Sequence, residues 1–284
     1  MTPTAPTQLV DLTALARHRA RGDIASAQFL HDDAIFEIKE RLIDVNRTFT
    51  KPAIVTPFAN VWGDVVAGAK VVADDDVLDL TPNSHDLIIH GMGLHWANDP
   101  VGQLIQCRHA LKPDGLLLVA MFGGETLNEL RAVLGQAEID LTSGLSPRVA
   151  PMGEVRDLGG LLQRAGLALP VADVLPRHVT YRGLIDLVAD LRAMGETNAL
   201  SARHRSFSSR AFFAHATTLY AANFPAEDNR IRATFDLIFL TGWAPDASQQ
   251  KPLRPGSAKA RLADALRTTE FDDTATPVLD RDLK

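Results

Sequence analysis

The sequence has few of the features that identify secreted, membrane or nucleic-acid-binding proteins. Its 284 residues include one cysteine, Cys107, which excludes an internal disulfide and a Cys-rich zinc site and indicates a reducing compartment. The longest uncharged apolar run, residues 115–124, is about half the length of a membrane-spanning helix. The formal net charge is -6, so no basic surplus suggests nucleic-acid binding. We therefore expect a globular protein with neither a nucleic-acid partner nor a transmembrane segment.

The amino-terminal sequence also lacks a secretory signal. Residues 1–23 have no charged start, apolar block or small-residue cleavage site. Their Leu, Ala and Arg content is faintly similar to a mitochondrial presequence, but Asp11 and Asp23 argue against that interpretation. We expect a cytoplasmic protein, or a mitochondrial matrix protein if the source is eukaryotic.

Hydrophobic periodicity predicts an α/β fold. The predicted strands cover residues 53–58, 70–73, 86–90, 116–122, 167–175 and 234–243. The predicted helices cover residues 10–21, 27–45, 59–67, 99–111, 154–165, 184–194 and 211–223. Strands that alternate with helices imply crossover connections, and therefore a mostly parallel sheet.

The same pattern predicts three parts in the chain. Residues 1–50 form N-terminal helices, and residues 51–258 form the α/β domain with a helical insertion at about 176–230, before the last strand. Residues 259–284 form a tail. The Lys-Pro-Asp-Gly sequence at residues 112–115 predicts a turn before the fourth strand, because Pro and Gly suit a tight reversal.

Several motifs carry a family resemblance. Residues 85–124, HDLIIHGMGLHWANDPVGQLIQCRHALKPDGLLLVAMFGG, resemble the region between the fourth and fifth strands of class I S-adenosylmethionine (SAM) methyltransferases. Within that superfamily the chain is similar to the branch of the mitochondrial complex I assembly factor of methyltransferase fold and the biotin-pathway carrier-protein methyltransferase. The motifs MFGGETLNELR, SPRVAPMGEVRDLGGLLQRAGL, LRAMGE and the late PxxxGSA at residues 252–258 extend the likeness over roughly residues 27 to 258.

The resemblance implies a trimmed class I methyltransferase (Rossmann-like) fold, SAM as cofactor, and a respiratory complex I subunit as protein partner. Two features depart from the family. Residues 55–63, VTPFANVWG, lack the glycine-rich turn that lets backbone amides approach the cofactor. Only 11 residues separate Phe58 from Lys70, and a parallel crossover needs about a dozen or more. We therefore expect that the second strand and its ribose-binding acid are deleted, and that SAM binding is weak or lost.

Five residues are candidates for what is left of a cofactor site. The resemblance places Asp74 and Asp75 on the adenine side, and Leu94, His95 and Trp96 on the wall after the fourth strand of the family. Asp74 and Asp75 can equally form a solvated acidic turn, which we favour. Trp96 can pack under the following helix while His95 binds backbone. Asp99 before Pro100 is most simply a helix N-cap.

A second group of residues is a candidate for substrate or partner binding. Glu125, Glu129 and Arg131 follow the fifth strand of the family, and Glu125 and Glu129 are one helical turn apart if that segment is helical. Such a pair can bind a guanidinium, or simply form a solvated helix face. Arg203 and Arg205 belong to a basic loop that can dock an acidic partner or merely be solvated.

We predict no metal site. The H-x-D match at residues 31–33 lies in a predicted helix, unlike the 2-His-1-carboxylate site of iron hydroxylases. The sequence therefore leaves three functions open: a partner-binding protein that has lost SAM, an active SAM-dependent methyltransferase, and a complex I assembly factor that hydroxylates protein arginine. It does not settle whether the protein is an enzyme, and it identifies no catalytic residue.

Overall fold

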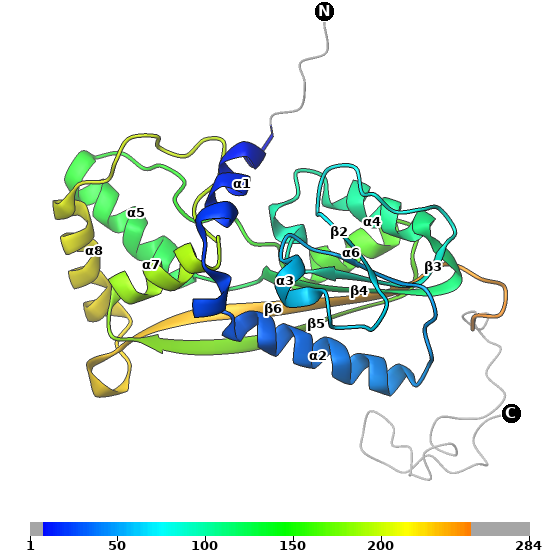
Figure 1. The fold of residues 1–284 in the computed structure, drawn as a ribbon. Coiled ribbons are helices and arrows are strands. Elements are labelled where there is room, and N and C mark those ends of the chain that lie inside the picture. Colours follow the sequence, from blue (N-terminus) through cyan, green and yellow to red (C-terminus); the bar gives the residue numbers. More distant parts are fainter. Residues whose placement is uncertain (1–7, 251–284) are drawn as a thin grey trace, which may run out of the picture. The chain divides into compact units, whose positions relative to one another are not determined.

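A computed structural model describes residues 8–250. Of these, residues 8–246 belong to one compact unit and residues 247–250 to a second. The first unit is built on a six-stranded sheet with the order β2-β1-β3-β4-β6-β5 (Figure 1). Its strands are β1 (Pro52–Val55), β2 (Lys70–Val72), β3 (His85–Gly91), β4 (Leu111–Gly123), β5 (Ala168–Tyr181) and β6 (Ile231–Trp243). The first four strands pair in parallel, and β6 is antiparallel to both β4 and β5.

Eight α-helices accompany the sheet in the described residues. They are α1 (Leu12–Arg21), α2 (Phe29–Val45), α3 (Ala59–Trp62), α4 (Pro100–Ala110), α5 (Asn128–Thr142), α6 (Val155–Arg164), α7 (Leu184–Ala193) and α8 (Arg210–Asn223). In Figure 1, α2 lies on one face of the sheet and α4 and α6 lie on the other, whereas α5, α7 and α8 gather at one end. None of the helices that the structure describes is long and apolar enough to cross a bilayer.

The central strands are apolar on both faces because both faces are covered. In β4, Leu116 and Leu118 pack in one hydrophobic cluster with Ile38 of α2. Leu117 and Val119 point the other way, into a cluster that includes Leu104, Cys107, Leu158 and Leu162 of α4 and α6. Successive side chains of a strand alternate between faces, so a strand buried on both sides reads as a continuous apolar run. Burial raises the pKa of the Cys107 thiol to about 12, which removes its reactivity near neutral pH.

The connection between β1 and β2 is a single short crossover. β1 pairs directly with β2, with Val55 opposite Val72, and the only element that the structure describes between them is α3, which is shorter than the predicted helix over 59–67. On this side of β1 the sheet contains one strand, β2, which lies at its edge. The connection is too short to add another strand between them, as the residue count predicts.

The mostly parallel α/β fold and its predicted elements are confirmed, with three differences besides the shorter α3. β5 continues to Tyr181 because residues 176–181 still pair with β6, so the helical insertion starts later than residue 176. The turn at residues 112–115 is an irregularity within β4, where Asp114 has φ 58°. The hydrophobic periodicity of the sequence did not predict the bounds of α5, which covers Asn128–Thr142. The predicted domain boundary at residue 50 stays a prediction, and the PxxxGSA motif, the boundary at residue 258 and the tail lie outside the described residues.

Candidate functional site

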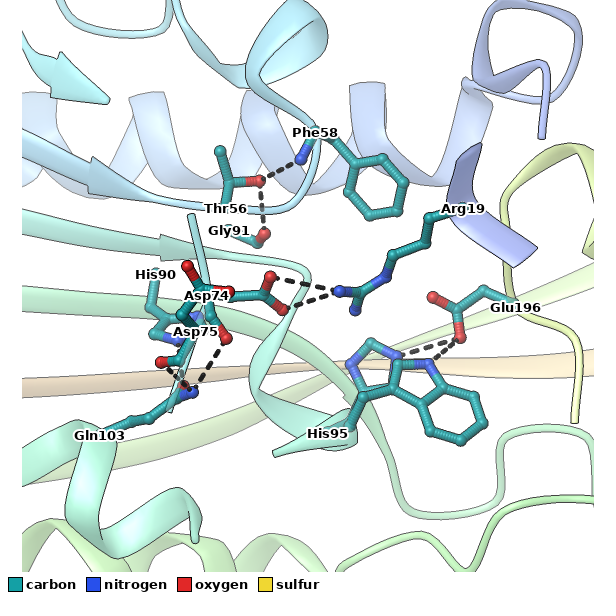
Figure 2. Close-up of polar contacts among 11 residues, drawn as sticks. Arg19, Thr56, Phe58, Asp74, Asp75, His90, Gly91, His95, Gln103 and Glu196 are labelled. Atoms are coloured by element: carbon teal, nitrogen blue, oxygen red, sulfur yellow. Dashed lines mark hydrogen bonds and ion pairs between the residues drawn. The ribbon is translucent and has the colours of Figure 1, made fainter. Parts of the chain in front are cut away.

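The carboxyl ends of the parallel strands form the candidate site. Residues 56–58 follow β1, Asp74 lies two residues after β2, and residues 92–96 follow β3. Open α/β sheets bind ligands at this edge, because the turns of several strands meet there. Figure 2 shows that two segments distant in sequence also reach it: Arg19 comes from α1, and Glu196 comes from the segment after α7.

The turn after β1 is fixed to β3 by a buried hydroxyl. Thr56 Oγ1 donates to the carbonyl oxygen of Gly91 at 2.9 Å and accepts from the amide of Phe58 at 3.1 Å. Phe58 is itself buried and packs edge-on against His31. The Thr56 hydroxyl and the buried Phe58 ring therefore fix this turn, and it lacks the glycines that would let a cofactor approach its backbone closely.

Asp74 is bound by an arginine from the N-terminal helix. Arg19 Nη1 lies 3.0 Å from Asp74 Oδ2 and 3.2 Å from Oδ1, and each side chain is 13% exposed (Figure 2). Gln103 of α4 donates to the carbonyl oxygens of Asp74 and Asp75, both at 3.1 Å. Gln103 therefore fixes the backbone of the acidic turn, and Arg19 fixes the Asp74 carboxylate.

Close packing around Gly93 completes this side of the edge. A Cβ atom on Gly93 would lie 2.6 Å from Asp74 Oδ2 and 3.1 Å from Pro57 Cδ. On β3, a Cβ on Gly91 would lie 2.5 to 2.9 Å from ring atoms of Trp62. Protein side chains thus lie against the backbone that follows β3.

His95 and Trp96 share one buried carboxylate. Trp96 Nε1 donates to Glu196 Oε2 at 2.6 Å, and His95 Nε2 lies 3.1 Å from the same oxygen. Burial raises the pKa of Glu196, but His95 and the more distant Arg19 lower it by more, so the net shift is downward and favours the carboxylate. His95 also packs edge-on against Phe122 of β4.

Two further histidines near the edge are buried and neutral. His90 of β3 lies 2.9 Å from Gln103 Oε1, and burial lowers its pKa. His31 of α2 accepts a hydrogen bond from Trp62 Nε1 at 3.1 Å, and burial lowers its pKa to about 4. The other two members of the H-x-D match turn elsewhere, because Asp32 binds Gln28 and Asp33 pairs with Arg177.

The predicted partner-binding acids do not come together. Glu125 precedes α5, which begins at Asn128, so it is not on the same helix as Glu129. Glu129 is buried and binds the hydroxyl and amide of Thr234 at 2.6 and 3.1 Å, anchoring α5 to β6. Glu125 accepts from Asn128 at the surface, and Arg131 donates to the carbonyl of Ala150.

The charge of the basic loop is partly neutralised by Asp11. Arg203 Nη2 donates to Asp11 Oδ2 at 2.9 Å, and Arg205 lies 3.9 Å from the same oxygen while remaining largely exposed. Asp11 is also the N-cap of α1, where it accepts from Ala14. Both arginines therefore help to hold the loop on α1.

Leu94 and Asp75 are the other two predicted residues of the cofactor site. Leu94 is fully buried in the hydrophobic cluster of α4 and α6, whereas the side chain of Asp75 is exposed. The sequence predictions did not include Arg19 or Glu196. Glu196 ends the LRAMGE motif, which was a signal for it, whereas Arg19 is one of several arginines on an amphipathic helix and has no distinguishing pattern.

Next to this edge, the structure contains a cavity of about 560 Å³. Trp96 and Glu196 line it, together with Phe122 of β4 and Phe235 of β6. Side chains of α5, α7 and α8 form further parts of its wall. The candidate site thus has a closely packed polar side, after β1 to β3, and a hollow apolar side, next to β4.

The sheet order and its antiparallel β6 define a Rossmann-like fold of the methyltransferase type. No family model matches the sequence. The chain is 38% identical over 194 residues to mitochondrial arginine-hydroxylase NDUFAF5 of Danio rerio, covering 68% of this chain and 60% of that protein. It is 33% identical over 182 residues to a malonyl-acyl-carrier-protein O-methyltransferase of Methylovorus sp. (strain MP688), covering 64% of this chain and 59% of that protein.

Among solved structures, the chain is similar to phosphoethanolamine N-methyltransferase 2 of Haemonchus contortus, with TM-score 0.37 and 12% identity over 70% of this chain and 50% of that one. The NDUFAF5 proteins and the malonyl-acyl-carrier-protein methyltransferases are thus homologues of this chain. It spans about 60% of the length of the two curated relatives described above.

Proposed function

We propose that this protein binds a partner protein through a methyltransferase fold in which SAM binding is weak or lost, and that the partner is a subunit of respiratory complex I. The observation that carries the proposal is the Arg19–Asp74 pair, since it engages the acid that the family resemblance assigns to the adenine side. The complex I partner rests on the family resemblance, and the proposed location is the cytoplasm, or the mitochondrial matrix if the source is eukaryotic.

The residues at the carboxyl ends of β1 to β3 do not fit SAM. The cofactor needs close-approaching backbone amides after β1 and an acid for the ribose hydroxyls. Here the turn after β1 is tied to Gly91 by Thr56, and Pro57 and Asp74 fill the space beside Gly93. Binding a nucleoside there requires breaking the Arg19–Asp74 pair. One lost hydrogen-bonded contact costs about 1–3 kcal/mol, so several such losses predict affinity weaker by orders of magnitude.

Calorimetry of the full chain with SAM tests this part of the proposal. We expect no saturable binding at micromolar SAM. Micromolar binding that is lost in Asp74→Asn but kept in Asp76→Asn, an exposed neighbour, would instead support the active methyltransferase.

The partner role needs a test in the cell. Deletion of the gene should lower the amount of assembled complex I, and a tagged chain should recover one of its subunits. Normal complex I in the deletion strain would refute the proposed partner, whatever the calorimetry reports.

Arginine hydroxylation is the second candidate, because the name of the 38% identical relative states that activity. In that case, the recovered partner should carry one additional oxygen atom on an arginine in the wild-type strain and lack it in the deletion strain. Mass spectrometry of the partner subunit distinguishes hydroxylation from binding alone.

A further inference from the structure

The cavity beside β4 has an apolar interior and a mostly cationic set of charged residues. Aromatic and aliphatic side chains from several elements line it, including Phe122, Leu130, Val188, Phe212 and Phe235. Its volume of about 560 Å³ is within the range of small-molecule sites, roughly 300–1,000 Å³. An interior of this kind accommodates a hydrocarbon chain or a ring, because burial of either removes apolar surface from water.

Positively charged side chains outnumber negatively charged ones in the cavity lining. Three arginines line the cavity, namely Arg148, Arg192 and Arg203. His18 and His204 also line it, but burial lowers the pKa of His18, which keeps that ring neutral near pH 7. Glu196 is the single acid in the lining, and it is already engaged by His95 and Trp96. The cavity therefore has cationic groups in excess and no free carboxylate to attract a cation.

One of these arginines has no counter-charge. Arg148 binds Glu138 at 2.8 Å, and Arg203 binds Asp11. Arg192 is an exposed residue near the end of α7 that lines the cavity, and its side chain forms no hydrogen bond or ion pair with any residue between 8 and 250. Its guanidinium is thus available to a ligand and well shaped for a carboxylate, which it can bind through two parallel hydrogen bonds.

Phe207 provides an independent observation that points to an apolar ligand. It lies in the loop before α8, lines the cavity, and is fully exposed. A fully exposed phenylalanine buries its ring only when something apolar covers it, and such groups often mark binding sites. Phe207 can therefore pack on the body of a ligand whose head binds Arg192.

We propose that this cavity is a binding site for an amphipathic carboxylate, a small molecule with an aliphatic chain in the apolar interior and its carboxylate on Arg192. The inference concerns binding alone, and it does not rest on the proposed loss of SAM or on a protein partner. The two proposals can therefore fail separately.

Three ligands with the same chain and different heads test the chemistry: octanoate, 1-octanol and octylamine, titrated calorimetrically into the full chain. We expect octanoate to bind about fivefold tighter than 1-octanol, and octylamine to bind weakest, because the one accessible counter-charge is positive. Equal affinity for octanoate and 1-octanol, or no saturable binding of octanoate, would overturn the proposal.

Two arginine variants test the position of the head. Arg192→Gln should reduce octanoate affinity about fivefold, to the value for 1-octanol, and leave 1-octanol unchanged. Arg164→Gln, an exposed arginine on α6 outside the cavity lining, makes the same change in net charge and should alter neither ligand. An equal loss in the two variants would mean general electrostatic attraction and would contradict the site.

Two further variants test the apolar interior. Val188→Trp places a larger side chain in the cavity and should abolish binding of octanoate and 1-octanol together. Because that variant can also unfold, Phe207→Ser provides the second test: its side chain is already exposed, so folding is unaffected, and both ligands should bind at least about twofold more weakly. Unchanged binding in Phe207→Ser and in a folded Val188→Trp would refute the site.

Discussion

Arg19 binds both carboxylate oxygens of Asp74 through a single guanidinium nitrogen, although the two residues are 55 positions apart. The contact joins α1 to the turn after β2, and both side chains are largely buried. Their mutual attraction therefore operates in an environment where water screens it weakly. The N-terminal helix is thereby tied to the edge of the sheet where a methyltransferase would bind its cofactor.

A double-mutant cycle on this pair should give a coupling free energy of about 1–3 kcal/mol. Arg19→Gln leaves the Asp74 carboxylate without its counter-charge, and Asp74→Asn does the converse, whereas the double variant removes both charges. Urea unfolding of the four proteins measures the coupling. The exposed pair Arg182–Asp186 is the control and should give about 0.5 kcal/mol or less. Similar coupling in the two pairs would contradict the interpretation of Arg19–Asp74 as a buried anchor.

Replacement of Glu196 should separate its two roles as an acceptor. Glu196→Ala leaves the Trp96 indole and the His95 imidazole without their shared acceptor, so we expect a loss of about 2–4 kcal/mol in the free energy of unfolding. Glu196→Gln keeps one side-chain oxygen that can accept from Trp96, so the loss should be smaller. Denaturant unfolding followed by circular dichroism measures both variants. If the two losses are the same within error, the buried hydrogen bonds are not the reason for the effect.

His31 should make stability depend on pH. Its pKa of about 4 in the folded protein lies below the value of 6.5 in an unfolded chain, so the unfolded state binds more protons between these pH values. The free energy of unfolding should therefore decrease as pH falls from 6.5 toward 4, by up to about 3 kcal/mol from this residue.

The variant His31→Asn keeps an acceptor for Trp62 but does not titrate, so its stability should decrease less over that pH range. His109→Asn, at an exposed position on α4, is the matched control and should leave the slope unchanged. Thermal unfolding at a series of pH values measures the difference. Parallel curves for His31→Asn and the wild type would show that His31 is not responsible.

Two glycines with opposite surroundings should respond oppositely to alanine. A Cβ at Gly91 would collide with the ring of the fully buried Trp62, so Gly91→Ala should cost about 2 kcal/mol or more. Gly160 lies within α6, and outside the local helix backbone and its two chain neighbours no atom lies within 4 Å of its would-be Cβ, so Gly160→Ala should stabilise by about 0.5–1 kcal/mol. Melting temperatures of the two variants test this, and a stable Gly91→Ala would mean that Trp62 can move aside.

Local patterns in the sequence were enough to locate most of the elements. β4 was recognisable because seven apolar residues in succession suit a strand covered on both faces, and the Asp99 cap of α4 because Pro follows it. The start of α5 was harder to predict, because the residue before the helix, Leu127, has a left-handed backbone conformation that no local sequence pattern indicates. The end of β5 was missed because Pro176 and Arg177 give no strand pattern, and only pairing with β6 extends it.

By itself, the sequence determined the order along the chain of the strands and of every helix except α5, and also the single short crossover between β1 and β2, because periodicity and chain length act locally. Tertiary structure decided the polar contacts of the site. Trp96 and Glu196 are 100 positions apart, and they meet because the segment after α7 packs next to the residues that follow β3. Helix packing likewise created the cavity beside β4, since its wall combines side chains from elements whose proximity no local pattern specifies.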